Sequence, residues 1–208
     1  MKGRAAVFVR YRSGDGAGHV GWAFDYDPPR RVDAGSVENH SGGIHSDASH
    51  MGYWSELSAD PVAYMRKNQY DDAKFVDVDD ADPVCAYETV LWIGKHAYTA
   101  IIRNCLDDAY DVLRAFGVPD LEPPSHDWFP KNWFAHFRGT QRPVTNFDWN
   151  EGRTAGGSGT TEALPDPDSL EPKAPDWRNP MSAVFSLFRL ELFRDFFRGL
   201  VHRRRRRG

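Results

Sequence analysis

Polar and apolar positions alternate most regularly near the start of the chain. Residues 19–26 (HVGWAFDY) carry an apolar side chain at every even position, and this period of two is typical of a strand with one buried face. A β-branched and aromatic run at residues 5–12 precedes it, and residues 31–40 follow the turn signal at Pro28 and Pro29. We therefore predict three antiparallel strands joined by turns.

A helical period replaces the strand period at residues 105–116 (CLDDAYDVLRAF). The apolar side chains of this stretch recur every three or four positions and so share one face of a helix. Asn104 can cap its first turn, and Gly117 together with Pro119 ends it. The sequence therefore predicts a helix that packs its apolar face on the rest of the domain.

Weaker signals between these regions predict further elements. We expect a helix at residues 62–68, a strand at 74–78 and a helix from 83 to about 95. Pro83 stands at a first-turn position where proline loses no hydrogen bond. Residues 41–52 (SGGIHSDASHMG) are expected to form a flexible loop.

Composition divides the chain into three parts. Residues 139–180 are rich in Gly, Pro, Thr, Asp and Glu, which is typical of a flexible linker. Residues 1–138 are expected to form one α+β domain, a small antiparallel sheet packed with helices. Residues 181–208 are expected to form an amphipathic helix with a polybasic tail, because phenylalanines and leucines share one side and five successive arginines follow.

Charge is distributed unevenly between these parts. The whole chain has 208 residues and a formal net charge of −4. The last 28 residues carry eight arginines and two acids, so the first 180 residues are strongly acidic. An acidic body argues against nucleic acid as the partner of the folded domain. The basic tail favours an anionic membrane surface as a partner for residues 181–208.

The cellular location follows from the same composition. No run of 18 apolar residues and no apolar leader stand in the sequence, and two cysteines cannot form a disulfide framework. We therefore expect a cytoplasmic protein, with peripheral membrane attachment if the tail binds lipid.

The strongest chemical signal is Cys105 at the first position of the predicted helix. The N–H groups and positive dipole end of a helix stabilise a thiolate and lower the pKa of the thiol. A buried cysteine that acts only as a small apolar side chain is the alternative interpretation.

His19 is the natural partner of this cysteine, because it begins a strand directly after a glycine-rich turn. An imidazole base needs an orienting group on its far nitrogen. If the hairpin turns near Pro28 and Pro29, residues 38 to 40 lie across from residue 19, and Glu38 and His40 share a strand face. We prefer His40 as the third member and Glu38 after it.

Two stretches resemble a known enzyme family. GHVGWAF at residues 18–24 resembles the histidine strand of the NlpC/P60 papain-like cysteine peptidases, and NCLDDAYDVLRAFG at 104–117 resembles their nucleophile helix. The histidine precedes the cysteine, as in the circularly permuted branch that includes the lecithin:retinol acyltransferase-like proteins. The resemblance covers roughly residues 5 to 118.

The resemblance implies a role for each matching residue. Cys105 corresponds to the nucleophile, His19 to the general base and His40 to the third polar residue. The oxyanion would be held by the main-chain N–H of the nucleophile, with the Tyr98 side chain as a weaker candidate for assistance. The implied fold is the permuted papain-like architecture, and no cofactor is implied.

A metal site is a competing interpretation. His40, His45 and His50 recur every five residues in the predicted loop. However, the chain has no CxxC or HExxH motif, so we predict no metal.

We therefore expect a cysteine-dependent hydrolase or acyltransferase that cleaves an amide, ester or thioester through an acyl-enzyme on Cys105. A peptide-like amide is the default substrate implied by the resemblance, and a lipid acyl group becomes the substrate if residues 181–208 bind a membrane. The alternative is a non-catalytic, membrane-associated adaptor that keeps the papain-like fold.

Overall fold

A computed structural model gives the fold of the described residues, which are 1–13, 16–27, 31–39, 45–46, 51–96, 98–99, 103–127, 129–153 and 163–175. The strands are β1 (Gly3–Arg10), β2 (His19–Asp27), β3 (Arg31–Asn39), β4 (His45–Ser46), β5 (Met51–Ser58), β6 (Asp72–Val78), β7 (Tyr98–Thr99) and β8 (Thr140–Pro143). The α-helices are α1 (Pro61–Lys67), α2 (Pro83–Gly94), α3 (Cys105–Phe116) and α4 (Pro130–His136). Two single-turn 3₁₀ helices span Val144–Asn146 and Pro167–Ser169.

Six strands form one antiparallel sheet in the order β5-β3-β2-β1-β6-β8. The predicted meander of β1, β2 and β3 is confirmed, with Val7 opposite Trp22 and Trp22 opposite Gly35. β4 and β7 pair separately as a two-residue ladder. The mixed α+β architecture predicted from the sequence is therefore present.

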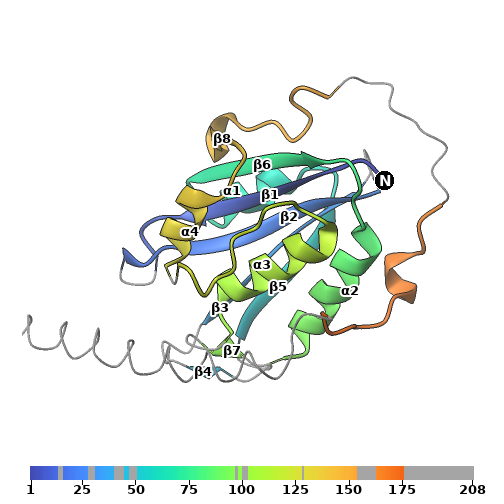
Figure 1. Cartoon of the computed structure of the whole chain (residues 1–208), viewed down its shortest axis with the longest axis horizontal. Helices are drawn as coiled ribbons and strands as arrows, with labels where there is room; N and C mark the ends of the chain where they lie inside the picture. The colour runs from blue at the N-terminus through green and yellow to red at the C-terminus, as the bar shows by residue number, and fades with distance from the viewer. Residues whose placement is uncertain are drawn as a thin grey trace, which may run out of the picture.

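Each face of the sheet is covered by different elements (Figure 1). The helices α2, α3 and α4 pack on one face, over an apolar cluster that includes Val20, Trp22 and Phe24. The short helix α1 packs on the other face, over a second cluster that includes Phe8 and Ala23. Because both faces are buried, every residue of β2 except its last is buried.

Side-chain caps fix where the longer helices begin. The Asp82 carboxylate accepts the Cys85 main-chain N–H at 2.9 Å, directly before Pro83. Asp82 is therefore the N-cap of α2. Helix α3 ends at Gly117, which adopts φ 96°, and this left-handed conformation ends the helix as predicted.

The structure corrects two predictions about the edges of the sheet. The predicted loop at residues 41–52 includes the start of β5, an eight-residue edge strand whose Trp54 lies opposite Ser36 of β3. The predicted linker at 139–180 begins with β8, which pairs with β6. The domain boundary at residue 138 is therefore wrong, because sheet pairing and apolar burial continue beyond it.

An aromatic strap after β8 closes the face of the sheet that α1 covers. Val144, Phe147 and Trp149 are buried in the second apolar cluster. Phe147 stacks on Phe75 of β6 with ring centroids 5.1 Å apart. This burial explains why the segment is ordered despite its polar surroundings in the sequence.

A buried carboxylate fastens this strap to the centre of the sheet. Asp25 of β2 accepts the Trp149 Nε1–H at 2.9 Å and the Arg4 main-chain N–H at 2.6 Å. It also forms an ion pair with Arg153. The Arg4 guanidinium in turn donates to the main-chain oxygen of Trp149 at 2.7 Å and to Asp77.

The remaining parts of the predicted linker and tail are only partly described. Residues 163–175 pack beside α2, where the Lys173 main-chain N–H donates to Glu88 O at 3.2 Å. The centre of the predicted linker and the predicted helix at 181–208 lie outside the described residues. In the described part of the chain, no helix is long and apolar enough to cross a membrane.

Candidate active site at the start of β2

The N-terminus of α3 is built around Asn104. Its side-chain oxygen accepts the main-chain N–H groups of Leu106 at 2.9 Å and Asp107 at 3.3 Å. The Asp107 carboxylate accepts the Asn104 N–H in return at 3.2 Å, which completes a capping box. This reciprocal cap places Cys105 at the first position of the helix, as the sequence predicted.

The Cys105 thiol lies inside the core. It is 4% exposed and belongs to the apolar cluster under α2 and α3. Burial raises the pKa of the Cys105 thiol to about 12, and the main-chain N–H of Val20 opposes this shift without overcoming it. The resting group at neutral pH is therefore a thiol, and the expected low-pKa thiolate is wrong for this resting state.

His19 begins β2 and is held by a hydroxyl of the neighbouring strand. Its Nε2 lies 2.8 Å from the Ser36 Oγ. The one proton of Ser36 is donated to the main-chain oxygen of Val20 at 3.1 Å, so the Ser36 oxygen is left to accept from His19. This arrangement puts the imidazole proton on Nε2 and leaves Nδ1 as an unprotonated acceptor.

Glu38 reinforces the same tautomer. Continuing the register of β2 and β3 by three residues from the pair of Trp22 and Gly35 places Glu38 opposite His19. The Glu38 Oε1 lies 3.7 Å from the His19 Nε2, and its other oxygen lies 3.4 Å from the Arg10 guanidinium. A negative charge near Nε2 favours a proton on that nitrogen.

Burial keeps the His19 ring neutral. The side chain is 7% exposed, and desolvation, followed by repulsion from the Arg10 cation, lowers the pKa of His19 to about 3. The imidazole is therefore in its basic form throughout the physiological pH range.

The polar partner of the His19 ring in the structure differs from the one preferred from the sequence. Ser36 makes the direct contact with His19, and Glu38, the second choice, stands next to it. His40, the first choice, lies outside the described residues, and so does the side chain of Tyr98, whose main chain forms β7. Ser36 was missed because serine carried no chemical signal of its own, although it shares a strand face with Glu38.

Cys105 and His19 meet at one end of β2 but are not paired. The sulfur lies against the main-chain N–H of Val20, the residue directly after His19. The His19 ring lies beside Tyr70, with centroids 5.9 Å apart, and Tyr70 belongs to the apolar cluster of the other sheet face. Among the described residues, no hydrogen bond joins the thiol and the imidazole.

The start of α3 also holds an available main-chain donor. The N–H groups of Leu106 and Asp107 bond to the Asn104 side chain, and that of Asp108 bonds to the Asn104 carbonyl. Within the described part of the chain, the Cys105 N–H has no such partner. It can therefore donate a hydrogen bond to negative charge that develops on a bound carbonyl oxygen.

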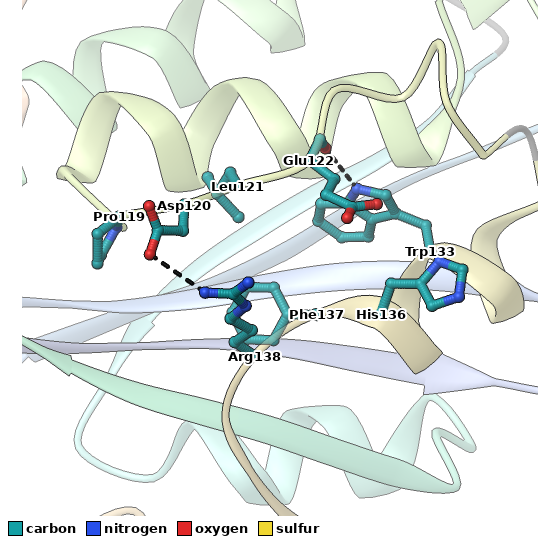
Figure 2. Close-up of a pocket in the computed structure, with 8 residues that line it drawn as sticks. All are labelled: Pro119, Asp120, Leu121, Glu122, Trp133, His136, Phe137 and Arg138. Carbon is teal, nitrogen blue, oxygen red and sulfur yellow. Dashed lines mark hydrogen bonds and ion pairs between the residues drawn. The ribbon is translucent and has the colours of Figure 1, made fainter.

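A small pocket lies elsewhere on the molecule (Figure 2). It is formed by the loop after α3 and by the end of α4, where Trp133 Nε1 donates to Glu122 O at 2.8 Å. An ion pair between Arg138 and Asp120 crosses its edge. None of the predicted site residues lines this pocket, so it adds nothing to the site at β2.

Comparison of the chain with protein-family models, curated proteins and solved structures found no match. In the described ranges, no group of three or more His, Cys, Asp or Glu side chains is placed to hold a metal ion. His40 and His50 of the competing metal interpretation lie outside those ranges, as does the side chain of His45.

The pKa of Cys105 gives a testable pH dependence. Alkylation of Cys105 by iodoacetamide in the folded protein is expected to accelerate continuously from about pH 6 to pH 10, because the thiolate fraction increases about tenfold per pH unit below the pKa. Peptide mapping by mass spectrometry separates Cys105 from Cys85. In guanidinium, the alkylation rate of the same thiol should level off once the pH exceeds the ordinary cysteine pKa of about 8.5. A rate of Cys105 alkylation that levels off below about pH 8.5 in the folded protein would contradict the effect of burial.

Proposed function

We propose that this protein is a cysteine-dependent hydrolase or acyltransferase that acts on an amide, ester or thioester. The observation that carries the proposal is the state of His19. Its Nε2 is bound to Ser36 and faces Glu38, which leaves Nδ1 as a base at the strand end where the Cys105 thiol rests.

The reaction would start from two neutral groups. With a thiol whose pKa is about 12 and an imidazole whose pKa is about 3, a preformed ion pair is unfavourable. The Cys105 proton would instead pass to the His19 Nδ1 as the sulfur attacks the acyl carbon. Positioning the two groups for this transfer requires a local rearrangement at the start of β2.

The remaining steps use groups at the same helix end. The main-chain N–H of Cys105 would donate to the oxyanion of the tetrahedral intermediate. The imidazolium would then give its proton to the leaving amine, alcohol or thiol, which leaves an acyl group on sulfur. Water, or a second nucleophile in a transferase, would attack this thioester with His19 again acting as the base and restore the free thiol.

The substrate class follows from the resemblance rather than from a shaped pocket. A peptide-like amide is the default. A lipid acyl ester becomes the substrate if residues 181–208 attach the protein to an anionic membrane surface.

Acyl trapping tests the proposal directly. The protein is incubated with p-nitrophenyl acetate, and the acetyl group is located by peptide mass spectrometry. We expect acetylation of Cys105 but not of Cys85, and a rate about 10²–10⁴-fold lower in His19→Gln. Cys85→Ala is the matched control and should acetylate like the parent.

The rival is a non-catalytic adaptor, and the burial of the Cys105 thiol favours it. In that case, Cys105 would be acetylated only when the protein unfolds, and at equal rates in the parent and His19→Gln. Circular dichroism of the variants separates this result from loss of fold.

A further inference from the structure

Tyr70 is a second buried polar side chain at the start of β2. Helix α1 ends in a Schellman motif, in which the Tyr70 N–H donates to Met65 O at 3.1 Å and the Gln69 N–H donates to Arg66 O at 3.0 Å. Gln69 occupies the left-handed position of this motif with φ 61°. A non-glycine residue is strained there, and this strained turn directs Tyr70 under the sheet.

The Tyr70 hydroxyl is held at the sheet without a hydrogen bond. The residue is 5% exposed, and within the described residues its oxygen has no hydrogen-bond partner. It occupies the space of a missing side chain, because a Cβ on Gly21 would lie 2.8 Å from the Tyr70 oxygen. A buried hydroxyl without a partner costs free energy, so its placement calls for an explanation.

Ser36 is the group that this hydroxyl faces. Continuing the β2–β3 register by one residue from the pair of Trp22 and Gly35 places Ser36 opposite Gly21, where the Tyr70 oxygen lies. Ser36 also opposes the burial that raises the pKa of Tyr70 far above its ordinary value. The Ser36 oxygen already donates to Val20 O and contacts the His19 Nε2. A serine hydroxyl has two acceptor sites, so one site remains for a second donor beside His19.

We propose that Tyr70 is a positioning residue for His19. A small movement would bring the Tyr70 hydroxyl into hydrogen-bond reach of the Ser36 Oγ, and by donating its proton there Tyr70 would hold Ser36 as an acceptor for the His19 Nε2–H. The consequence is a hydroxyl chain from Tyr70 through Ser36 to His19 that keeps Nδ1 unprotonated. This role rests on the proposed function, because a bare Nδ1 matters only if His19 is the base for Cys105.

The raised pKa of Tyr70 suits this role. A phenol that stays neutral over the whole working range remains a donor, whereas a phenolate would compete with Ser36 for the imidazole proton. The ring also stands beside the imidazole, and Ser36 is fully buried there.

The test reads the His19 tautomer by ¹⁵N NMR of the imidazole nitrogens, in the free protein at pH 7 and without substrate. Tyr70→Phe keeps the ring and removes only the hydroxyl. We expect the parent to hold the proton on Nε2 and the variant to shift the tautomer ratio about fivefold toward Nδ1. His19→Gln identifies the His19 signals.

Two further variants make the result specific. Tyr11→Phe removes a hydroxyl that bonds to Asp72 and should leave the His19 signals as in the parent. In Ser36→Ala, adding Tyr70→Phe should change nothing more, because the chain is already broken at its middle.

Each outcome decides one of the two proposals. Parent-like His19 signals in Tyr70→Phe, or an equal further shift in the Ser36→Ala background, would overturn the role of Tyr70 even if Cys105 is acetylated normally. The expected shift without acetylation of Cys105 would support the hydroxyl chain and refute the catalytic function.

Discussion

Replacing Asp25 by alanine is expected to lower the free energy of unfolding by about 3–5 kcal/mol. Asp25 is fully buried and accepts hydrogen bonds from Trp149 and from the Arg4 main chain while it pairs with Arg153. Its removal leaves a guanidinium and two buried donors without their acceptor, which costs more than the pair itself contributes. Guanidinium denaturation followed by circular dichroism measures the loss.

Asp27→Ala is the matched control for this variant. Asp27 is on the same strand but half exposed, and among the described residues it pairs only with the nearby Arg31 at 3.4 Å. A change of at most about 1 kcal/mol is expected there. Similar losses in the two variants would show that the Asp25 contacts do not fasten the strap.

The second large effect concerns Asp33, and its sign depends on pH. Asp33 of β3 is fully buried and accepts from Trp22 Nε1 at 2.8 Å and Ser55 Oγ at 2.5 Å. Burial raises the pKa of Asp33 from 3.8 to about 7, against the effect of these two donors. Between about pH 4 and pH 7, Asp33 therefore keeps its proton in the folded state but has lost it in the unfolded state. Its contribution lowers the free energy of unfolding as pH rises through that window.

Asp33→Asn removes this titration and keeps the side-chain shape. The amide oxygen can accept from Trp22, and the amide nitrogen can donate to Ser55. At pH 8, we expect the variant to be about 2–4 kcal/mol more stable than the parent, and the difference to fade toward pH 4.

Denaturation of both proteins at several pH values checks the Asp33 prediction, because the contribution of His19 is common to both and cancels in the difference. Glu56→Gln is the control, since Glu56 lies near Asp33 but on the exposed side of β5. A constant difference across the pH range would contradict the raised pKa of Asp33.

The elements that could be predicted from the sequence are those with strong local signals. Helix α3 matches its predicted range because a capping box and a left-handed glycine mark both ends. The hairpin of β2 and β3 follows from alternation and a proline turn. Such signals act over a few residues and need no knowledge of the tertiary fold.

The missed elements include helix α4, the short β4–β7 ladder and the two edge strands of the sheet, β5 and β8. In β5, Gly52 to Ser58 mix aromatic, acidic and hydroxyl side chains, because an edge strand contacts only one neighbour. β8 (TQRP) is mostly exposed and polar. Its position depends on the burial of Phe147 and Trp149, whose partners are distant in the sequence and could not be anticipated.

The candidate site was predicted only in part for a similar reason. Cys105 and His19 carry chemical signals, and the register makes Glu38 a neighbour of His19. The burial that raises the pKa of Cys105 and lowers that of His19 is a property of packing. Residue type and spacing therefore identified candidate groups near the start of β2, but neither the direct Ser36 partner of His19 nor the protonation states of these groups.

The central place of β1 in the sheet has a consequence for how the chain folds. Its pairs with β2 join residues 9 to 19 positions apart, whereas its pairs with β6 join residues 63 to 75 positions apart. After β2 ends at Asp27, 45 to 51 residues are still to be made before the start and the end of β6 (Asp72 and Val78) are present. At about 5–20 residues per second, synthesis would leave the second edge of β1 open for roughly 2–10 s after its hairpin has formed. Contact order of this kind slows folding, so this apolar edge is the place where the nascent chain is most exposed to pairing with another molecule.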